Sequence, residues 1–100
     1  AKNKKLRVSG IMDPRTIAKF HELIGAPEYG MIYDKTWIYL GKWLGFLSGF
    51  NHTKTQVRTF QRRIGMSYPD VTGSWYDEES KTFDPKTVKA LQRYLNENQA

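Results

Sequence analysis

The stretch VSGIMDPRTIAKFHELIG at residues 8–25 recurs in altered form as VTGSWYDEESKTFDPKTVKALQRYLN at residues 71–96. Each copy has a Val-Ser/Thr-Gly turn, an Asp-Pro-basic-Thr sequence and then a segment with helical spacing of apolar residues. A third copy of that last segment alone, TQVRTFQRRIG, occupies residues 55–65. Repetition constrains the architecture of a chain, because each unit buries its apolar side against its neighbours. The sequence therefore predicts turn-plus-helix units packed together.

The three helical segments carry apolar residues at matching positions, spaced by three and then four residues. That spacing places each set on one side of a helix. We expect nine residues in the core: Ile17, Phe20, Ile24, Val57, Phe60, Ile64, Val88, Leu91 and Leu95. A polar residue, His21, Gln61 or Gln92, follows the central apolar residue of each segment. Because two of the three are glutamines, the position predicts a helix-surface or hydrogen-bonding role.

Start and stop signals flank these segments. The Asp-Pro pairs at 13–14 and 84–85 predict helix N-termini, since Asp accepts free backbone N–H groups and Pro fits the first turn. Gly25, Gly65 and Asn96 follow the last apolar residues, where a left-handed residue often ends a helix.

Glycines also mark the turns that precede the helices. Gly10, Gly30 and Gly73 each follow a short extended run, and this placement predicts a positive φ. The second residue after each glycine is apolar and is expected to fold back onto the adjacent helix. Trp75 is accordingly expected to fill the core.

These signals predict one small domain, mainly α with short β-hairpin pieces, built from degenerate turn-plus-helix pseudo-repeats. The expected helices lie near 14–24, 35–44, 55–64 and 86–97. Extended pieces are expected near 6–11, 29–33 and 70–75, with their pairing into hairpins left open. We expect residues 1–5 to be a linker or arm, and 6–100 to be the domain, with pseudo-repeats at about 6–50 and 54–97. The chain looks like a fragment of a longer protein.

Composition narrows the chemistry. The chain has 100 residues, of which 39% are hydrophobic and 26% charged, as in an ordinary small domain. Cysteine is absent, so disulfides and thiolate metal ligands are excluded. No metalloprotease, nucleophile-elbow or phosphate-loop motif occurs. We therefore expect no catalytic residues, no metal and no cofactor.

The formal net charge is +6, and much of the excess lies in the first seven residues. Lys54, Arg58 and Arg62 follow at intervals of four residues and form one basic stripe. The stripe is either a solvated helix surface or a contact for an anionic polymer. The apolar segment at 37–50 would reach only about 21 Å as a helix, too short for a bilayer core of about 30 Å.

The repeated motifs resemble a known family. VKALQRYLN, VRTFQRRIG and TIAKFHELIG are similar to the helix of peptidoglycan-binding repeats, and VSGIMDPRT and VTGSW are similar to its turn. YGMIYDKTW at 29–37 resembles a second, degenerate turn leading into a Trp-containing helix. The nearest resemblance is to the C-terminal cell-wall-binding region of phage endolysins that attack Gram-positive bacteria. It covers most of residues 6–96, with an insertion at 76–83.

The resemblance implies a non-catalytic module that binds peptidoglycan or wall polysaccharide and targets a muralytic phage enzyme. Its implied partners are a cell-wall glycan or teichoic-acid-type polymer and a catalytic domain upstream, with no nucleic acid and no membrane. Such a protein would be made in the cytoplasm of the infected host and act at the wall. The parent would be a peptidoglycan hydrolase.

Aromatic residues are the candidate sugar contacts, because flat rings with polar tips suit a half-wet surface. If 36–47 is helical, its core stripe is Trp37, Leu40, Leu44 and Leu47. A second stripe would then consist of Tyr39, Trp43, Phe46 and Phe50. The expected ligand contacts are Tyr33, Tyr39, Trp43, Phe50, Tyr68 and Tyr76, with Arg58 and Arg62 as anion contacts. Tyr39 and Trp43 are the best candidates, although each aromatic residue could instead close the core.

Two other functions stay open on the sequence alone. The arginines of TQVRTFQRRIG and the basic N-terminal arm could serve a small helical nucleic-acid-binding domain, whose affinity would fall steeply with salt. The aromatic segment 37–50 could instead make the chain a homodimerisation module.

Overall fold

The computed structural model describes residues 5–46 and 53–98. Its elements are, in chain order, α1 (Pro14–Ile24), α2 (Asp34–Leu44), α3 (Lys54–Arg63), β1 (Tyr76–Asp77), β2 (Thr82–Phe83) and α4 (Pro85–Glu97). The predicted fold class is confirmed, because the domain is mainly α-helical and carries a short antiparallel hairpin. The predicted helix bounds differ from the observed ones by at most one residue.

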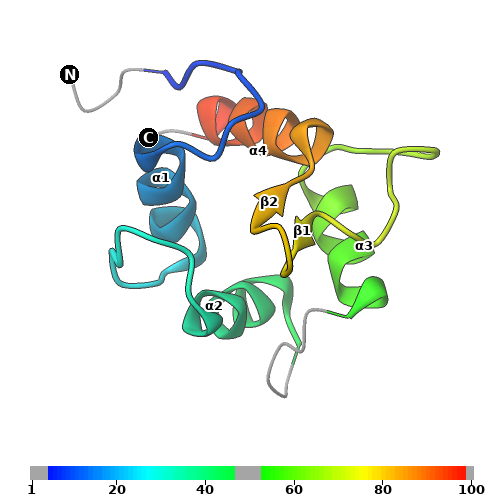
Figure 1. Ribbon diagram of the computed structural model, residues 1–100, viewed down its shortest axis with the longest axis horizontal. Helices are drawn as coiled ribbons and strands as arrows, with labels where there is room; N and C mark the ends of the chain where they lie inside the picture. The colour runs from blue at the N-terminus through cyan, green and yellow to red at the C-terminus, as the bar shows by residue number, and fades with distance from the viewer. Residues whose placement is uncertain (1–4, 47–52, 99–100) are drawn as a thin grey trace.

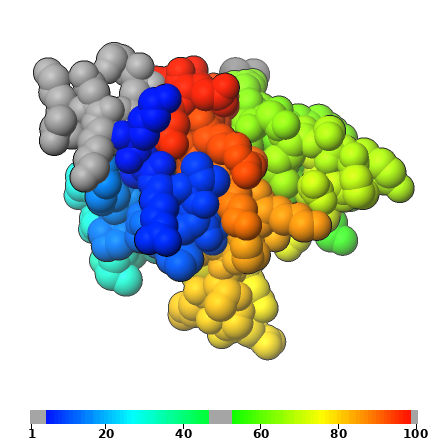
Figure 2. Space-filling view, turned by 90° about the horizontal axis from the view of Figure 1, so that it is seen from above, coloured from blue at the N-terminus to red at the C-terminus, as the bar shows by residue number. Residues whose placement is uncertain are grey.

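The four helices form a ring around a shared interior (Figure 1). Helix α1 packs against both α2 and α4, and α2 packs against α3. The last helix thus returns to the first. The N-terminal segment lies along α4 as well, as Figure 2 shows from above. Asn96 fixes it there, since its side chain bonds the backbone N–H and C=O of Leu6.

Trp75 occupies the middle of the ring and is only 1% exposed. Its ring centroid lies 5.8 Å from that of Phe20 in α1, 5.8 Å from that of Trp37 in α2 and 4.8 Å from that of Phe60 in α3. Phe83 of β2 closes the set at 5.0 Å. The predicted role of Trp75 as a core residue is confirmed, and one side chain thereby joins three of the four helices.

The interior contains most of the residues that the periodicity predicts. Eight of the nine are buried, and the exception is Ile17, which is half-buried. In the first turn of α1 the fully buried place belongs to Thr16. Helix α2 adds Trp37, Leu40 and Leu44, as expected, and Leu47 lies outside the described residues.

Helices α1, α2 and α3 follow one another at intervals of 20 residues, so that Phe20, Leu40 and Phe60 occupy equivalent buried places. The glycine after each helix repeats at the same interval, with φ of 77° at Gly25, 92° at Gly45 and 97° at Gly65. Helix α2 is therefore a further copy of the unit.

Two local expectations are corrected. Helix α4 continues through Asn96 and is capped by Asn98, because the Asn96 side chain holds Leu6 in place of ending the helix. The segments 6–11, 29–33 and 70–75 form no strand; the hairpin lies in the inserted segment, where Tyr76 pairs with Phe83 and Asp77 with Thr82. It projects from the body of the molecule (Figure 2).

Buried glutamines explain why the turns need no strand partner. Gln92 of α4 is 0% exposed, and its Oε1 accepts the N–H groups of Ser9 and Gly10, both at 3.0 Å. Its Nε2 donates to the carbonyl of Ile11 and the hydroxyl of Thr16, also at 3.0 Å. One amide side chain therefore satisfies the backbone of a turn and ties it to the start of the next helix.

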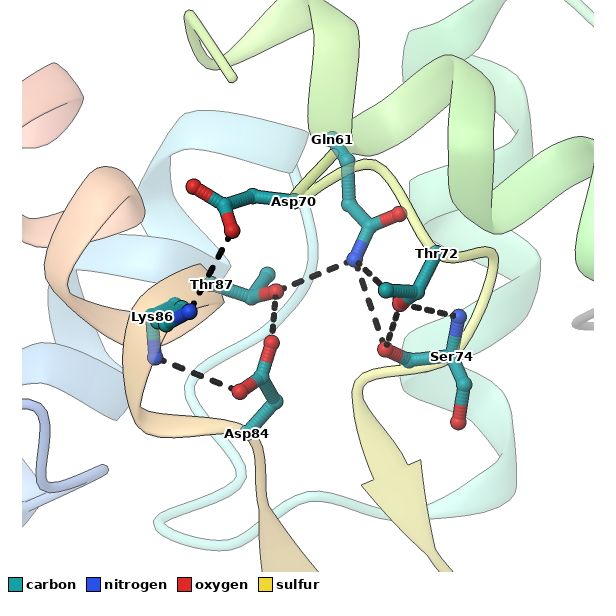
Figure 3. A network of polar contacts seen from close by, with 7 residues as sticks. All are labelled: Gln61, Asp70, Thr72, Ser74, Asp84, Lys86 and Thr87. Carbon is teal, nitrogen blue, oxygen red and sulfur yellow. Dashed lines mark hydrogen bonds and ion pairs between the residues drawn. The ribbon is translucent and has the colours of Figure 1, made fainter. Parts of the chain in front are cut away.

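Gln61 of α3 makes three equivalent bonds to the turn at Gly73 and to α4, and Figure 3 shows those that its Nε2 donates. Its Oε1 accepts the N–H of Gly73 at 2.9 Å, and its Nε2 donates to the Ser74 carbonyl at 3.3 Å and the Thr87 hydroxyl at 3.0 Å. Thr87 in turn donates to the N-cap carboxylate of Asp84 at 2.7 Å. The position predicted to be surface or hydrogen-bonding is thus buried, and the hydrogen-bonding alternative is correct.

We expect Gln61→Ala to destabilise the domain, because the Gly73 N–H would lose its buried acceptor. Stranding one such group costs about 1–3 kcal/mol, and each kcal/mol shifts the melting temperature of a domain this size by roughly 4–8 °C. Thermal unfolding followed by circular dichroism measures the shift. Thr55→Ala, at an exposed position of the same helix, is the control and should melt near wild type. Equal melting temperatures for the two variants would contradict this role of Gln61.

Candidate functional site

Three tyrosines gather at the start and along one flank of α2, and we call them the tyrosine cluster: Tyr29, Tyr33 and Tyr39. The rings of Tyr29 and Tyr33 meet edge to face at 5.9 Å, and the hydroxyl of Tyr39 bonds to that of Tyr29. Tyr33 is 50% exposed. The structure therefore brings two of the predicted sugar contacts together and adds Tyr29, which the sequence analysis missed.

Tyr29 is uncharged, and neighbouring side chains hold the tyrosine cluster in place. Partial burial, with the neighbouring Tyr39 hydroxyl, raises the pKa of Tyr29 above its ordinary value of 10.0. Its phenol therefore stays a neutral hydrogen-bonding group at physiological pH. The Tyr29 ring also rests edge to face on His21, with centroids 5.4 Å apart, and the ammonium of Lys42 lies 5.5 Å from the centre of the Tyr39 ring. The result is a preformed surface of rings and hydroxyls.

Trp43, the other leading candidate, lies one turn beyond Tyr39 but has a second role. The guanidinium of Arg63 lies 5.3 Å from the Trp43 ring centroid, and the ring of Tyr94 meets it edge-on at 6.1 Å. Trp43 therefore joins α2 to α3 and α4 through its ring, and it is half-buried. Because the Arg63 guanidinium already lies over the indole, less of the Trp43 ring is available to a ligand than the sequence predicts.

The remaining aromatic candidates are scattered. Tyr68 is 92% exposed at the tip of the segment between α3 and the hairpin. Tyr76 is half-buried in β1, where its ring centroid lies 4.6 Å from that of Phe83. Phe50 lies outside the described residues. Tyr68 thus lies in a segment far from the tyrosine cluster in sequence, whereas the ring of Tyr76 meets that of Trp37 in α2, with centroids 6.0 Å apart.

The two predicted anion contacts lie on the outer side of α3. We call a turn whose glycine N–H is accepted by a buried glutamine a gripped turn, and the residue that accepts it the gripping residue. Arg62 is exposed, and Arg58 is half-buried because its stem packs beside the gripped turn at Gly73. A Cβ added to Gly73 would lie 3.3 Å from Arg58 Cγ and 3.0 Å from the carbonyl oxygen of Lys54. Only glycine, with its φ of 83°, fits the turn at this distance.

His21 occupies the position at which α3 and α4 carry glutamine. It shares the bonds that a glutamine makes with a second residue, Glu28. Its Nε2 lies 3.0 Å from the Thr36 hydroxyl, as Gln61 and Gln92 reach the equivalent threonines. Its Nδ1 lies 3.4 Å from Glu28 Oε1 without a hydrogen bond. Glu28 Oε1 accepts the Gly30 N–H at 2.8 Å. The imidazole and the carboxylate together therefore replace one glutamine.

A depression of about 390 Å³ opens beside this pair, between α1 and the segment after it. His21 and Glu28 line it together with the basic side chains of Arg15 and Lys19. His21 is 0% exposed, so the depression meets the imidazole only at its floor. Its charges are mixed, which favours no particular ligand.

Several kinds of site are missing from the described part of the chain. No three His, Cys, Asp or Glu side chains within residues 5–46 and 53–98 gather closely enough to hold a metal ion. Among the helices of the same residues, none has the length and apolarity needed to cross a membrane.

Comparison with known proteins identifies no relative: the chain matches no family model, no curated protein and no solved structure.

We expect His21→Gln to be tolerated, because glutamine at this place can bond both Thr36 and the Gly30 N–H, as its two counterparts do. Its free energy of unfolding should stay within about 1 kcal/mol of wild type, whereas His21→Ala should lose about 2 kcal/mol or more through the cavity and the lost bond. Urea unfolding followed by circular dichroism separates the two. If glutamine proves as damaging as alanine, the equivalence of the three positions is wrong.

Proposed function

We propose that this chain is a non-catalytic module that binds the bacterial cell wall and holds a muralytic phage enzyme on its substrate. The observation that carries the proposal is the tyrosine cluster, in which Tyr29, Tyr33 and Tyr39 present rings and hydroxyls at the start and along one flank of α2. Aromatic side chains of this kind favour surfaces where one end is apolar and the other is wet. A glycan offers both kinds of partner, C–H patches and hydroxyl groups.

The tyrosine cluster can bind a ligand without a large conformational change, because part of it belongs to a helix. Tyr39 and Lys42 project from a helix whose other side is buried through Trp37, Leu40 and Leu44. Contacts held on a rigid element lose little conformational freedom when a ligand arrives. The same residues on a free loop would have to be ordered first.

The polar groups that could otherwise serve catalysis already have structural roles. The carboxylate of Asp13 caps α1 through the Thr16 N–H at 2.8 Å, and Asp84 caps α4 through Lys86 and Thr87. His21 is buried against Thr36. These roles support a module that grips a polymer and leaves its cleavage to another domain.

In this proposal a catalytic domain precedes the module in the parent peptidoglycan hydrolase, which is made in the infected host cytoplasm and acts at the wall. Tethering would raise the effective concentration of that domain at its substrate by an amount set by the linker. The binding partner is a glycan or another polymer of the Gram-positive wall.

We expect a fluorescent fusion of the chain to be retained on purified Gram-positive walls, and Tyr33→Ala/Tyr39→Ala to reduce that retention about tenfold. Truncating a hot-spot aromatic residue costs more than about 1 kcal/mol of binding free energy, and tenfold corresponds to about 1.4 kcal/mol, the loss expected when one of the two rings is such a hot spot. The measurement is the bound fraction in a wall pull-down across a range of wall concentrations.

Ile38→Ala is the matched control, because Ile38 is 43% exposed on the same helix but outside the tyrosine cluster. It should bind as wild type does. Circular dichroism checks the fold of each variant, and Tyr33→Ala alone, which touches the most exposed ring, serves if the double variant unfolds. A wild-type fusion that labels no wall preparation would rule out the proposed function.

A further inference from the structure

A basic groove runs between α4 and the segment after α3. It has a volume of about 330 Å³, and its charged lining consists of Lys86, Lys89, Arg93 and Asp70. The first three project from one side of α4, at intervals of three and four residues, which places them in a row. Figure 2 shows α4, in orange and red, beside that segment, in yellow-green, at the surface.

The charges in the basic groove do not balance. Asp70 pairs with Lys86 at 3.3 Å, as Figure 3 shows. No carboxylate in residues 5–46 and 53–98 pairs with Lys89 or Arg93. The groove therefore presents two cations whose charge is not neutralised by a described neighbour, and a concave surface of net positive charge concentrates anions from solution.

Lys89 is held in position by the fold. Its Cε would lie 3.2 Å from a Cβ at Gly10, so its stem rests against the turn that Gln92 grips. A lysine stem packed on the protein surface keeps its ammonium in water at a defined place. Arg93 follows one turn later on the same helix and supplies the flat, multiple donors that suit phosphate oxygens.

The same pair occurs in the preceding unit. When the two gripping glutamines are aligned, Arg58 matches Lys89 and Arg62 matches Arg93. Arg58 packs beside the Gly73 turn as Lys89 packs beside the Gly10 turn. A cation pair next to the gripped turn is thus a repeated feature of α3 and α4, which a randomly solvated helix surface would not require.

An exposed aromatic ring accompanies the groove. Tyr68, with 92% of its surface exposed, belongs to the same segment that lines the groove with Ser67 and Asp70. An exposed ring on the segment that borders the groove offers a further contact for a chain in which sugars or polyols alternate with phosphates. A neutral glycan would use only the ring.

We infer that the basic groove binds the phosphodiester groups of an anionic wall polymer, with Lys89 and Arg93 as the phosphate contacts. This inference rests on the proposed wall-binding function and assigns it a second site, separate from the tyrosine cluster. Each phosphodiester carries one negative charge, so a polymer can engage the pair through successive units. Charge-assisted contacts of this kind weaken as salt rises.

The test compares intact Gram-positive walls with the same walls stripped of phosphodiester polymers by hydrofluoric acid. We expect Lys89→Gln/Arg93→Gln to lower retention on intact walls roughly tenfold, the size expected for losing two charge-assisted contacts. Retention on stripped walls should not change. Arg7→Gln/Lys35→Gln is the control, because both residues are exposed and the same charge is removed; it should bind as wild type does.

Three results would overturn the inference: an equal loss on stripped walls, an equal loss in the control, or no loss on intact walls. The inference would also fail if retention of duplex DNA at about 150 mM salt depended on Lys89 and Arg93 while wall binding did not. That result would assign the groove to nucleic acid. Tyr33→Ala is measured on both preparations. If its binding falls while the groove variant has no effect, the proposed wall-binding function stands and only the groove assignment fails.

Discussion

The structure depends on buried amide side chains that hold the backbone of each turn. Gln92 and Gln61 each accept a turn glycine N–H, at 3.0 and 2.9 Å, and each donates to a threonine hydroxyl in the helix that follows that turn. These bonds lie in the interior, where an unpaired amide or N–H is costly. A turn, the helix after it and the helix that grips it are therefore bound into one unit, and neither a strand partner nor a disulfide is needed. Because Gln92 belongs to the last helix and grips the first turn, the units close into a ring around Trp75.

The closure also determines what the surface can offer. The hydrogen bonds of Gln92 hold α4 against the Gly10 turn. The Lys89 stem therefore packs on that turn, where a Cβ on Gly10 would lie only 3.2 Å from Lys89 Cε. The same logic places Arg58 beside Gly73. Helix α2 carries Gly41 at the gripping position, so it contributes no side chain of this kind, and its flank is instead occupied by tyrosines. The interior amides thus hold the ring, while cations and aromatic rings, which carry the proposed recognition role, are distributed over different helices outside it.

Most of the fold could be predicted from the sequence, because most of its signals are local. The caps at Asp13 and Asp84 and the positive φ of Gly10 could be predicted because each depends on neighbours within a few residues. The contacts of Gln92 could not, since its partners lie more than 70 residues away and follow only from the order of helices around the ring. The candidate site divides in the same way. Periodicity placed Tyr39 on the flank of α2, but the approach of Arg63 and Tyr94 to Trp43 comes from α3 and α4 and has no local signature.

In the proposed function, a repeated scaffold with differing side chains at equivalent places would let one small domain contact a heterogeneous polymer. At this position of α1, α3 and α4 the chain keeps a hydrogen bond to a threonine at the start of another helix, with either an amide or the His21–Glu28 pair, because the fold needs it. One residue further, the equivalent residues are Glu22, Lys42, Arg62 and Arg93, and nothing in the interior constrains them. Two of these four are arginines on adjacent helices, each following a cation that packs on a gripped turn. These outward-facing positions are therefore where selection for a ligand can act without cost to the ring.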